Sequence, residues 1–117
     1  MNVPLLPGAG DLAYEHVLDS VFIPLAEEFR PQVIIMVDGS DTHFMDQITQ
    51  MGLTLKGIYM IADKVRRAAD RIYQGKVIAF AGSGCDPKGI LFPRGWLASV
   101  CGLTGLEIEL DEPYPFP

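Results

Sequence analysis

Two apolar runs separated by one amphipathic segment constrain the fold of this chain more than any other feature. The runs lie at residues 33–37 and 76–80, and after Lys76 neither is interrupted by a polar residue. Continuous runs of this length are typical of strands covered on both faces, as in a parallel sheet. Between them, apolar residues recur at helical steps of three and four, at Leu55, Ile58, Ala62, Val65, Ala69 and Ile72. This order predicts a strand-helix-strand unit with a right-handed crossover.

The flanking segments extend this unit to a β-α-β-α-β-α pattern. Residues 2–6 are expected to be extended, because Pro4 and Pro7 bias the residues before them away from helix. Asp11 is expected to cap a helix that closes near residues 27–31, and Pro24 inside it is expected to kink the helix or to remove one hydrogen bond. A shorter helix is expected near residues 94–101, with an apolar side made by Trp96, Leu97 and Val100. We therefore predict a three-layer α-β-α fold with a mostly parallel sheet.

The central helix carries its own start and stop signals. Thr54 can cap its beginning, and Gly75 occupies the usual position just beyond its end. The opposite face of this helix carries most of the basic residues of the chain, which we interpret as a solvated surface rather than a binding patch. The length of 117 residues fits one domain, at 1–117.

Composition narrows the function and the location. The chain has a formal net charge of −6, which argues against a nucleic-acid or anionic-membrane surface. It shows no signal peptide, no run of membrane-spanning length and only two cysteines, so we expect a cytoplasmic protein with free thiols. Hydrophobic residues make up 49% of it, which suggests more apolar surface than one small domain covers. A partner surface is therefore expected.

The candidate chemistry lies in the loops that follow the two predicted strands. Asp41 and His43 stand two residues apart after the first strand, where parallel sheets gather their ligands, and both residue types bind divalent cations. A capping aspartate and a surface histidine explain the same pair equally well. After the second strand, Gly82-Ser83-Gly84 fits a tight turn better than a phosphate cradle. Cys85 follows as a possible nucleophile without an evident base, whereas Cys101 is expected in the core.

Several motifs in the same order resemble the histone deacetylase superfamily, in particular its acetoin-utilisation and acetylpolyamine amidohydrolase-like members. Residues 2–11 are similar to the family segment N-V-P-L-x-P-G-x-G-D. Residues 37–43 are similar to S-A-G-F-D-A-H, and Asp46 with residues 52–54 resembles the D-P-L and L-x-L-T that follow. Residues 82–86 fall on the family segment E-G-G-Y-[DN]. The resemblance implies the C-terminal part of an arginase/deacetylase-like fold.

The resemblance also implies roles for single residues. Asp41 stands at the position of the third zinc ligand, and His43 is its neighbour, which is not usually counted as a ligand. Cys85 stands at the position of the tyrosine that stabilises the oxyanion. The family's other zinc ligands and its paired histidines precede the part that is matched here, and one carboxylate does not hold a catalytic zinc firmly. Zinc binding is therefore expected to be weak or absent.

Three functions stay open at this point. The first is a truncated deacetylase-like protein that is inactive alone and persists as a homo-oligomer, strand-paired or domain-swapped. The second is a zinc-dependent amidohydrolase whose other half comes from another chain. The third is a small-ligand or metal-binding module that uses Asp41, His43 and Cys85 in a new arrangement.

Overall fold

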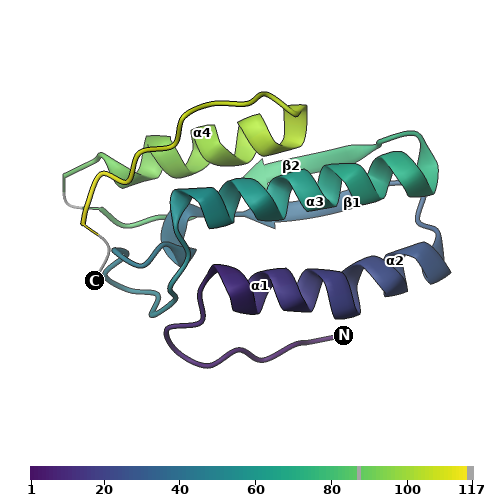
Figure 1. Ribbon diagram of the computed structural model, residues 1–117, viewed down its shortest axis with the longest axis horizontal. Coiled ribbons are helices and arrows are strands. Elements are labelled where there is room, and N and C mark those ends of the chain that lie inside the picture. The colour runs from purple at the N-terminus through teal and green to yellow at the C-terminus, as the bar shows by residue number, and fades with distance from the viewer. Residues whose placement is uncertain (87, 116–117) are drawn as a thin grey trace.

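The computed structural model describes residues 1–86 and 88–115, and its order of elements confirms an α/β fold. Strands β1 (Ile34–Asp38) and β2 (Val77–Ala81) pair in parallel, with Ile34 opposite Val77 and Asp38 opposite Ala81. Both strands begin and end one residue later than predicted. Helix α3 (Leu55–Tyr73) connects them and lies over one face of the sheet (Figure 1).

The signals at both ends of α3 are borne out. The hydroxyl of Thr54 accepts a hydrogen bond of 3.0 Å from the N–H of Gly57, as an N-cap does. At the other end, Gln74 and Gly75 both adopt left-handed backbone angles, with φ of 55° and 67°. The N–H of Gly75 then donates to the carbonyl of Ala69 over 3.1 Å, which closes the last turn.

The N-terminal helical region differs from its prediction in two ways. It consists of α1 (Asp11–Val17), the π-helical segment η1 (Leu18–Phe22) and α2 (Ile23–Phe29). Pro24 stands in the first turn of α2, where its missing N–H does least harm, and the wider π turn lies directly before it. Asp11 is the first helical residue rather than the cap. Its carboxylate accepts a hydrogen bond from the N–H of Thr54, before α3, instead of capping its own helix.

Residues 2–6 form no strand, although we predicted an extended segment that starts the pattern. The neighbouring turn instead lies against the loop before α3. The N–H of Gly8 donates to the carbonyl of Gln50 over 2.7 Å, and the N–H of Gly52 donates to the carbonyl of Ala9 over 2.9 Å. The N-terminal turn is thereby attached to the beginning of α3.

Helix α4 (Leu91–Thr104) is longer than predicted, and its buried side is a different one. Leu97 and Val100 are 52% and 56% exposed, whereas Cys101 is buried as expected. The buried side consists largely of small residues: Gly95, Ala98, Ser99, Cys101 and Gly102. A Cβ added to Gly102 would lie 2.5 Å from the carbonyl oxygen of Tyr59, so α4 approaches α3 too closely for larger side chains.

The helices cover one face of the sheet and leave the other open in the described part of the chain. In Figure 1, α3 lies in front of the strands and runs along them, with α4 on one side and α1 and α2 on the other. The uncovered face presents Ile35, Val37, Ile78 and Phe80, which are 65%, 80%, 50% and 57% exposed. The continuous apolar strands thus predict a second covering layer that the described residues do not supply.

Candidate functional site

The two loops that carry the predicted site residues lie side by side at the carboxyl ends of the strands. Their backbones stay paired beyond the sheet. The N–H of Gly82 donates to the carbonyl of Asp38 over 2.6 Å, and the N–H of Ser40 donates to the carbonyl of Ser83 over 2.9 Å. The first loop begins with the 3-10 turn η2 (Ser40–Thr42). Parallel pairing therefore brings Asp41 and Cys85 to the same edge, as the strand order predicts.

A hollow of about 310 Å³ lies between these loops. Its walls include Asp41 and Cys85, which the sequence analysis singled out, but not His43. The other residues that line it are Asp46, Ile48, Thr49, Ser83 and Gly84. The structure thus brings Asp41 and Cys85 together, whereas His43, the third predicted site residue, does not line the hollow.

Asp41 enters the hollow from η2 without a hydrogen bond or ion pair to its carboxylate from any described residue. A Cβ added to Gly39 would lie 2.6 Å from Oδ1 of Asp41 and 2.6 Å from Oγ of Ser83, so a larger residue there would displace both side chains. The charge of Asp41 also reaches α1. Burial first, and then this charge, raise the pKa of Tyr14 above its ordinary value.

His43 is fully buried and uses both nitrogens of its ring. Its Nδ1 accepts a hydrogen bond of 3.2 Å from the N–H of Met45, and its Nε2 lies 2.8 Å from Oε2 of Glu112. The ring also stacks on Phe44, with 4.4 Å between the ring centroids. These contacts occupy both of the nitrogens that could bind a metal, so this geometry gives His43 a place in the packing of the loop.

Glu112 is a functional candidate that sequence reasoning missed. Its other carboxylate oxygen, Oε1, accepts a hydrogen bond of 2.6 Å from the N–H of Leu55, the first residue of α3. A carboxylate at this end of a helix is favoured by the helix dipole. Residue 112 follows Asp111 and precedes Pro113 at the start of the proline-rich tail, and nothing in this local sequence distinguishes it from the other acidic residues nearby.

Asp46 ties the first loop to the second. Its Oδ1 accepts from the N–H groups of Ile48 and Thr49, and its Oδ2 accepts from the N–H of Cys85 over 2.8 Å. Burial raises the pKa of this carboxyl, but the three N–H groups outweigh burial and lower it. The ionised form of Asp46 is therefore the form that holds Cys85 in place.

Gly84, directly before Cys85, allows close packing. A Cβ on Gly84 would lie 2.8 Å from Cδ2 of Phe92 and would also collide with the hydroxyl of Ser40. Cys85 itself is half-buried with a free thiol. Residues 82–86 form no turn: they continue beside residues 38–40 and pack against η2 and α4, so the tight turn that the sequence favoured is not found there.

Asp86 fills the position in which a phosphate cradle would hold an anion. Its carboxylate accepts from the N–H groups of Ile90 and Leu91, over 2.6 Å each, where α4 begins. The N–H of Leu91 is the main cause that lowers the pKa of Asp86 to about 2, with further help from Lys88, Ile90 and Tyr114. The protein's own carboxylate thus occupies the N–H groups that a phosphate needs.

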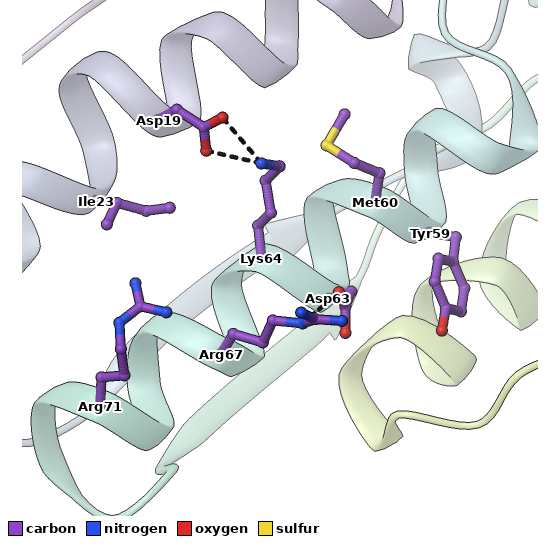
Figure 2. A pocket seen from close by; sticks show the side chains of 8 residues that line it. All are labelled: Asp19, Ile23, Tyr59, Met60, Asp63, Lys64, Arg67 and Arg71. Carbon is purple, nitrogen blue, oxygen red and sulfur yellow. Dashed lines mark hydrogen bonds and ion pairs between the residues drawn. The ribbon is translucent and has the colours of Figure 1, made fainter.

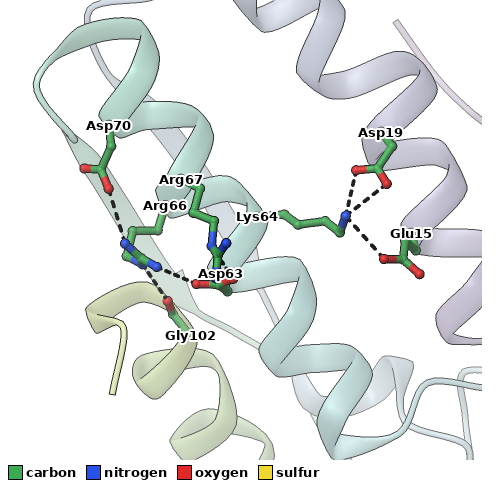
Figure 3. A network of polar contacts seen from close by, with 8 residues as sticks. All are labelled: Glu15, Asp19, Asp63, Lys64, Arg66, Arg67, Asp70 and Gly102. Carbon is green, nitrogen blue, oxygen red and sulfur yellow. Dashed lines mark hydrogen bonds and ion pairs between the residues drawn. The ribbon is translucent and has the colours of Figure 1, made fainter. Parts of the chain in front are cut away.

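A larger hollow of about 550 Å³ lies between η1 and α3, away from the strand ends, and presents Lys64, Arg67 and Arg71 (Figure 2). Each of these cations has a carboxylate partner. Lys64 contacts Asp19 at 2.8 Å and Glu15 at 3.3 Å, as Figure 3 shows. The two arginines pair with Asp63 and Glu27, at 2.7 Å and 3.2 Å. This neutralised network fits the solvated surface that the sequence suggested.

The described residues contain no group of three or more histidine, cysteine, aspartate or glutamate side chains placed to hold a metal ion. Among them, no helix has the length and apolar character needed to cross a membrane.

Comparison with known proteins places these loops in a family context. Residues 1–101 match the model of the histone deacetylase domain. The chain is 35% identical to a probable deacetylase of Archaeoglobus fulgidus over 112 residues, which cover 93% of this chain and 30% of that protein. It is also 35% identical to the acetoin utilization protein AcuC of Staphylococcus xylosus over 105 residues, which cover 90% of this chain and 27% of that protein.

Solved structures give the same result. The histone deacetylase Clr3 superposes on 100% of this chain with a TM-score of 0.78 and 27% identity, and 19% of that chain is covered. The HD domain of HDA15 superposes with a TM-score of 0.70 at 22% identity, which supports the fold alone. The chain therefore spans less than a third of the length of the relatives it matches.

Proposed function

This chain belongs to the histone deacetylase family, and from that premise we propose that it is a partial deacetylase domain without deacetylase activity on its own. One observation carries the proposal: Asp41 shares its hollow with Asp46 and Cys85, but these side chains are not placed to hold a metal ion together. A catalytic zinc has three protein ligands and one open position. Asp41 offers one carboxylate, His43 has both ring nitrogens engaged, and no group of three ligating side chains exists in the described residues. The residues present do not fit a catalytic zinc.

The residue at the family's tyrosine position supports the same proposal. By the resemblance, Cys85 stands where a phenol would donate a hydrogen bond to the oxyanion. A thiol is a weak donor and is shorter than a phenol. Loss of one oxyanion donor costs about 2.7–4 kcal/mol of barrier. Even with a metal supplied, we expect this hollow to stabilise an oxyanion poorly.

We further propose that the chain works as an assembled module, with a second copy on the open face of the sheet. Four large apolar side chains, Ile35, Val37, Ile78 and Phe80, are half or more exposed there. Monomers rarely expose a contiguous apolar patch above a few hundred Å². Each strand also keeps one unpaired edge in the two-stranded sheet, and such edges favour strand pairing between chains.

A second candidate function rests on how short this chain is beside its relatives. Because this chain spans 30% or less of its relatives, another polypeptide could supply both the covering layer and the missing ligands. In that case Asp41 would be one ligand of a zinc site shared between two chains. The two candidates differ in what covers the sheet and in whether zinc is retained.

Light scattering together with metal analysis of the purified chain tests both. We expect a dimer or a larger assembly that holds well under one zinc per chain and releases no acetate from acetyl-lysine. Phe80→Asp places a charge on the open face and should yield monomers, whereas Leu12→Asp, at an 82% exposed position on α1, should leave the assembly unchanged. A zinc-replete monomer that releases acetate would contradict the proposal.

A further inference from the structure

The last segment of the described chain, residues 106–115, returns from α4 to the hollow. Gly105, with φ of 71°, reverses the chain after α4. The N–H of Leu106 then donates to the backbone carbonyl of Cys101 over 3.0 Å. The segment then runs back beside α4 to the end of the molecule where the strands end (Figure 1). We call residues 106–115 the strap. The match to the family domain ends at residue 101, so the strap lies outside it.

The strap is fastened at several points along its length. Leu110 packs on the core cluster that contains Leu53, Ile58 and Ala98. The carbonyl of Asp111 accepts a hydrogen bond of 3.0 Å from Nη1 of Arg94 on α4. These contacts bring the next residue, Glu112, over the beginning of α3.

Glu112 adds a side-chain link between two parts of the molecule whose backbones also meet, where the N–H of Phe44 donates to the carbonyl of Leu53 over 2.9 Å. One carboxylate oxygen binds the N–H of Leu55 at 2.6 Å, and the other binds Nε2 of His43 at 2.8 Å. The side chain of His43 is 0% exposed, so the loss of this acceptor would leave a ring N–H buried without a partner. Such a group costs more than the hydrogen bond itself contributed.

From His43 the contacts lead directly to the walls of the hollow. The carbonyl of His43 accepts from the N–H of Asp46 over 3.0 Å, and the carboxylate of Asp46 accepts from the N–H of Cys85 over 2.8 Å. The strap reaches the second loop as well, because the hydroxyl of Tyr114 donates to Asp86 over 3.0 Å. Both loops of the hollow are thus in contact with the strap.

We propose that the strap is a positioning element of the hollow, and that Glu112 is the positioning residue that holds the Asp41 loop against the start of α3. Glu112 acts through His43 and Asp46, not by contact with anything bound in the hollow. Without it the loop keeps its backbone bonds to Leu53 but loses the side-chain link to Leu55, so His43, Asp46 and Cys85 become more mobile. The inference goes beyond the proposed function, because it holds whether or not the chain binds metal or assembles.

The thiol of Cys85 reports this mobility in the intact protein. We would measure its alkylation by iodoacetamide at fixed pH, and use peptide mapping to separate it from Cys101, which is 1% exposed. Glu112→Ala should accelerate alkylation of Cys85 by roughly tenfold or more, the factor that corresponds to one hydrogen bond with a charged group. Glu112→Gln keeps one acceptor oxygen and should give a smaller increase. The matched control is Glu109→Ala, which removes the same charge from an exposed position of the strap.

Amide hydrogen exchange gives a second, local measurement. The amides of Met45 and Leu55 donate to His43 and Glu112, so both should exchange faster in Glu112→Ala while the amides in the middle of α3 stay protected. The inference is overturned if Cys85 reacts no faster in the Glu112 variants than in Glu109→Ala. It is equally overturned if Cys85 and Cys101 accelerate together, since Glu112 then only stabilises the whole fold. If Glu112→Ala does not fold, Glu112→Gln decides by the same two criteria.

Discussion

Gly57→Ala places two opposite effects of known size in competition at the start of α3. Alanine is favoured over glycine in a helix by up to about 1 kcal/mol, so the usual expectation is a more stable protein. Here an added Cβ would overlap Oδ1 of Asp11 and lie 2.6 Å from its Cγ. Asp11 would have to move away. Its carboxylate accepts from the N–H of Thr54 at 2.9 Å and from the hydroxyl of Thr54 at 2.7 Å.

The second effect should prevail. A hydrogen bond to a charged group contributes about 1.5–3 kcal/mol, and two of them are lost together. Because Asp11 is only half-buried, we expect the free energy lost per hydrogen bond to lie toward the lower end of that range. After the gain in helix propensity is subtracted, Gly57→Ala should lower the free energy of unfolding by about 2 kcal/mol.

Urea denaturation followed by circular dichroism measures this, in a cycle with Asp11→Ala. Once the Asp11 carboxylate is removed, the nearest of the remaining atoms is Cδ2 of Leu53, 2.9 Å from the added Cβ and at the end of a flexible side chain. Gly57→Ala should then be neutral or stabilising, so the two sites should couple by about 2 kcal/mol. Lys56→Ala, at the neighbouring exposed position, serves as the control. Equal effects of Gly57→Ala in both backgrounds would refute the reasoning.

Three further substitutions test other parts of the structure. Asp86 has a folded pKa of about 2 against an ordinary value of 3.8. Its contribution to stability is therefore complete above pH 3.8 and is lost as the pH falls toward 2. Asp86→Asn should remove that part of the acid dependence of the urea midpoint. Asp41→Asn should lower the pKa of Tyr14, which an NMR titration of the ring reads directly, and an unchanged pKa would mean that Asp41 does not face this ring. Gly95→Ala should destabilise the protein by about 1–3 kcal/mol, because the added Cβ would lie 2.5 Å from Cβ of Ser40; thermal unfolding unchanged from the parent chain would contradict this packing.

The elements that the sequence predicted well are those whose signals are local. The apolar steps of α3 and its cap at Thr54 lie within one stretch of chain, and both were confirmed. The parallel pairing also followed, because a helical crossover between two apolar strands has few arrangements. The buried side of α4 was predicted wrongly, since hydropathy favours Leu97 and Val100. Close helix packing instead selected small residues such as Gly102.

The candidate site was predictable only in part, for a related reason. Asp41 and Cys85 follow paired strands, so their positions at one edge could be inferred from the strand order. The environment of His43 could not be inferred, because its partner Glu112 lies 69 residues further along the chain. Nothing in the local pattern of either residue indicates such a contact. The metal-ligand role of Asp41 and the catalytic position of Cys85 stay predictions.

The strap also sets an order of events during synthesis. Its contacts with Leu55 and His43 span 57 and 69 residues, and contacts of such long range close late because a large loop must first be ordered. Chains emerge and fold from the N-terminus, so α3 and its Thr54 cap can form before Glu112 has been made. A nascent chain would therefore pass through a stage in which the helix is folded while the ring of His43 still lacks its Glu112 partner.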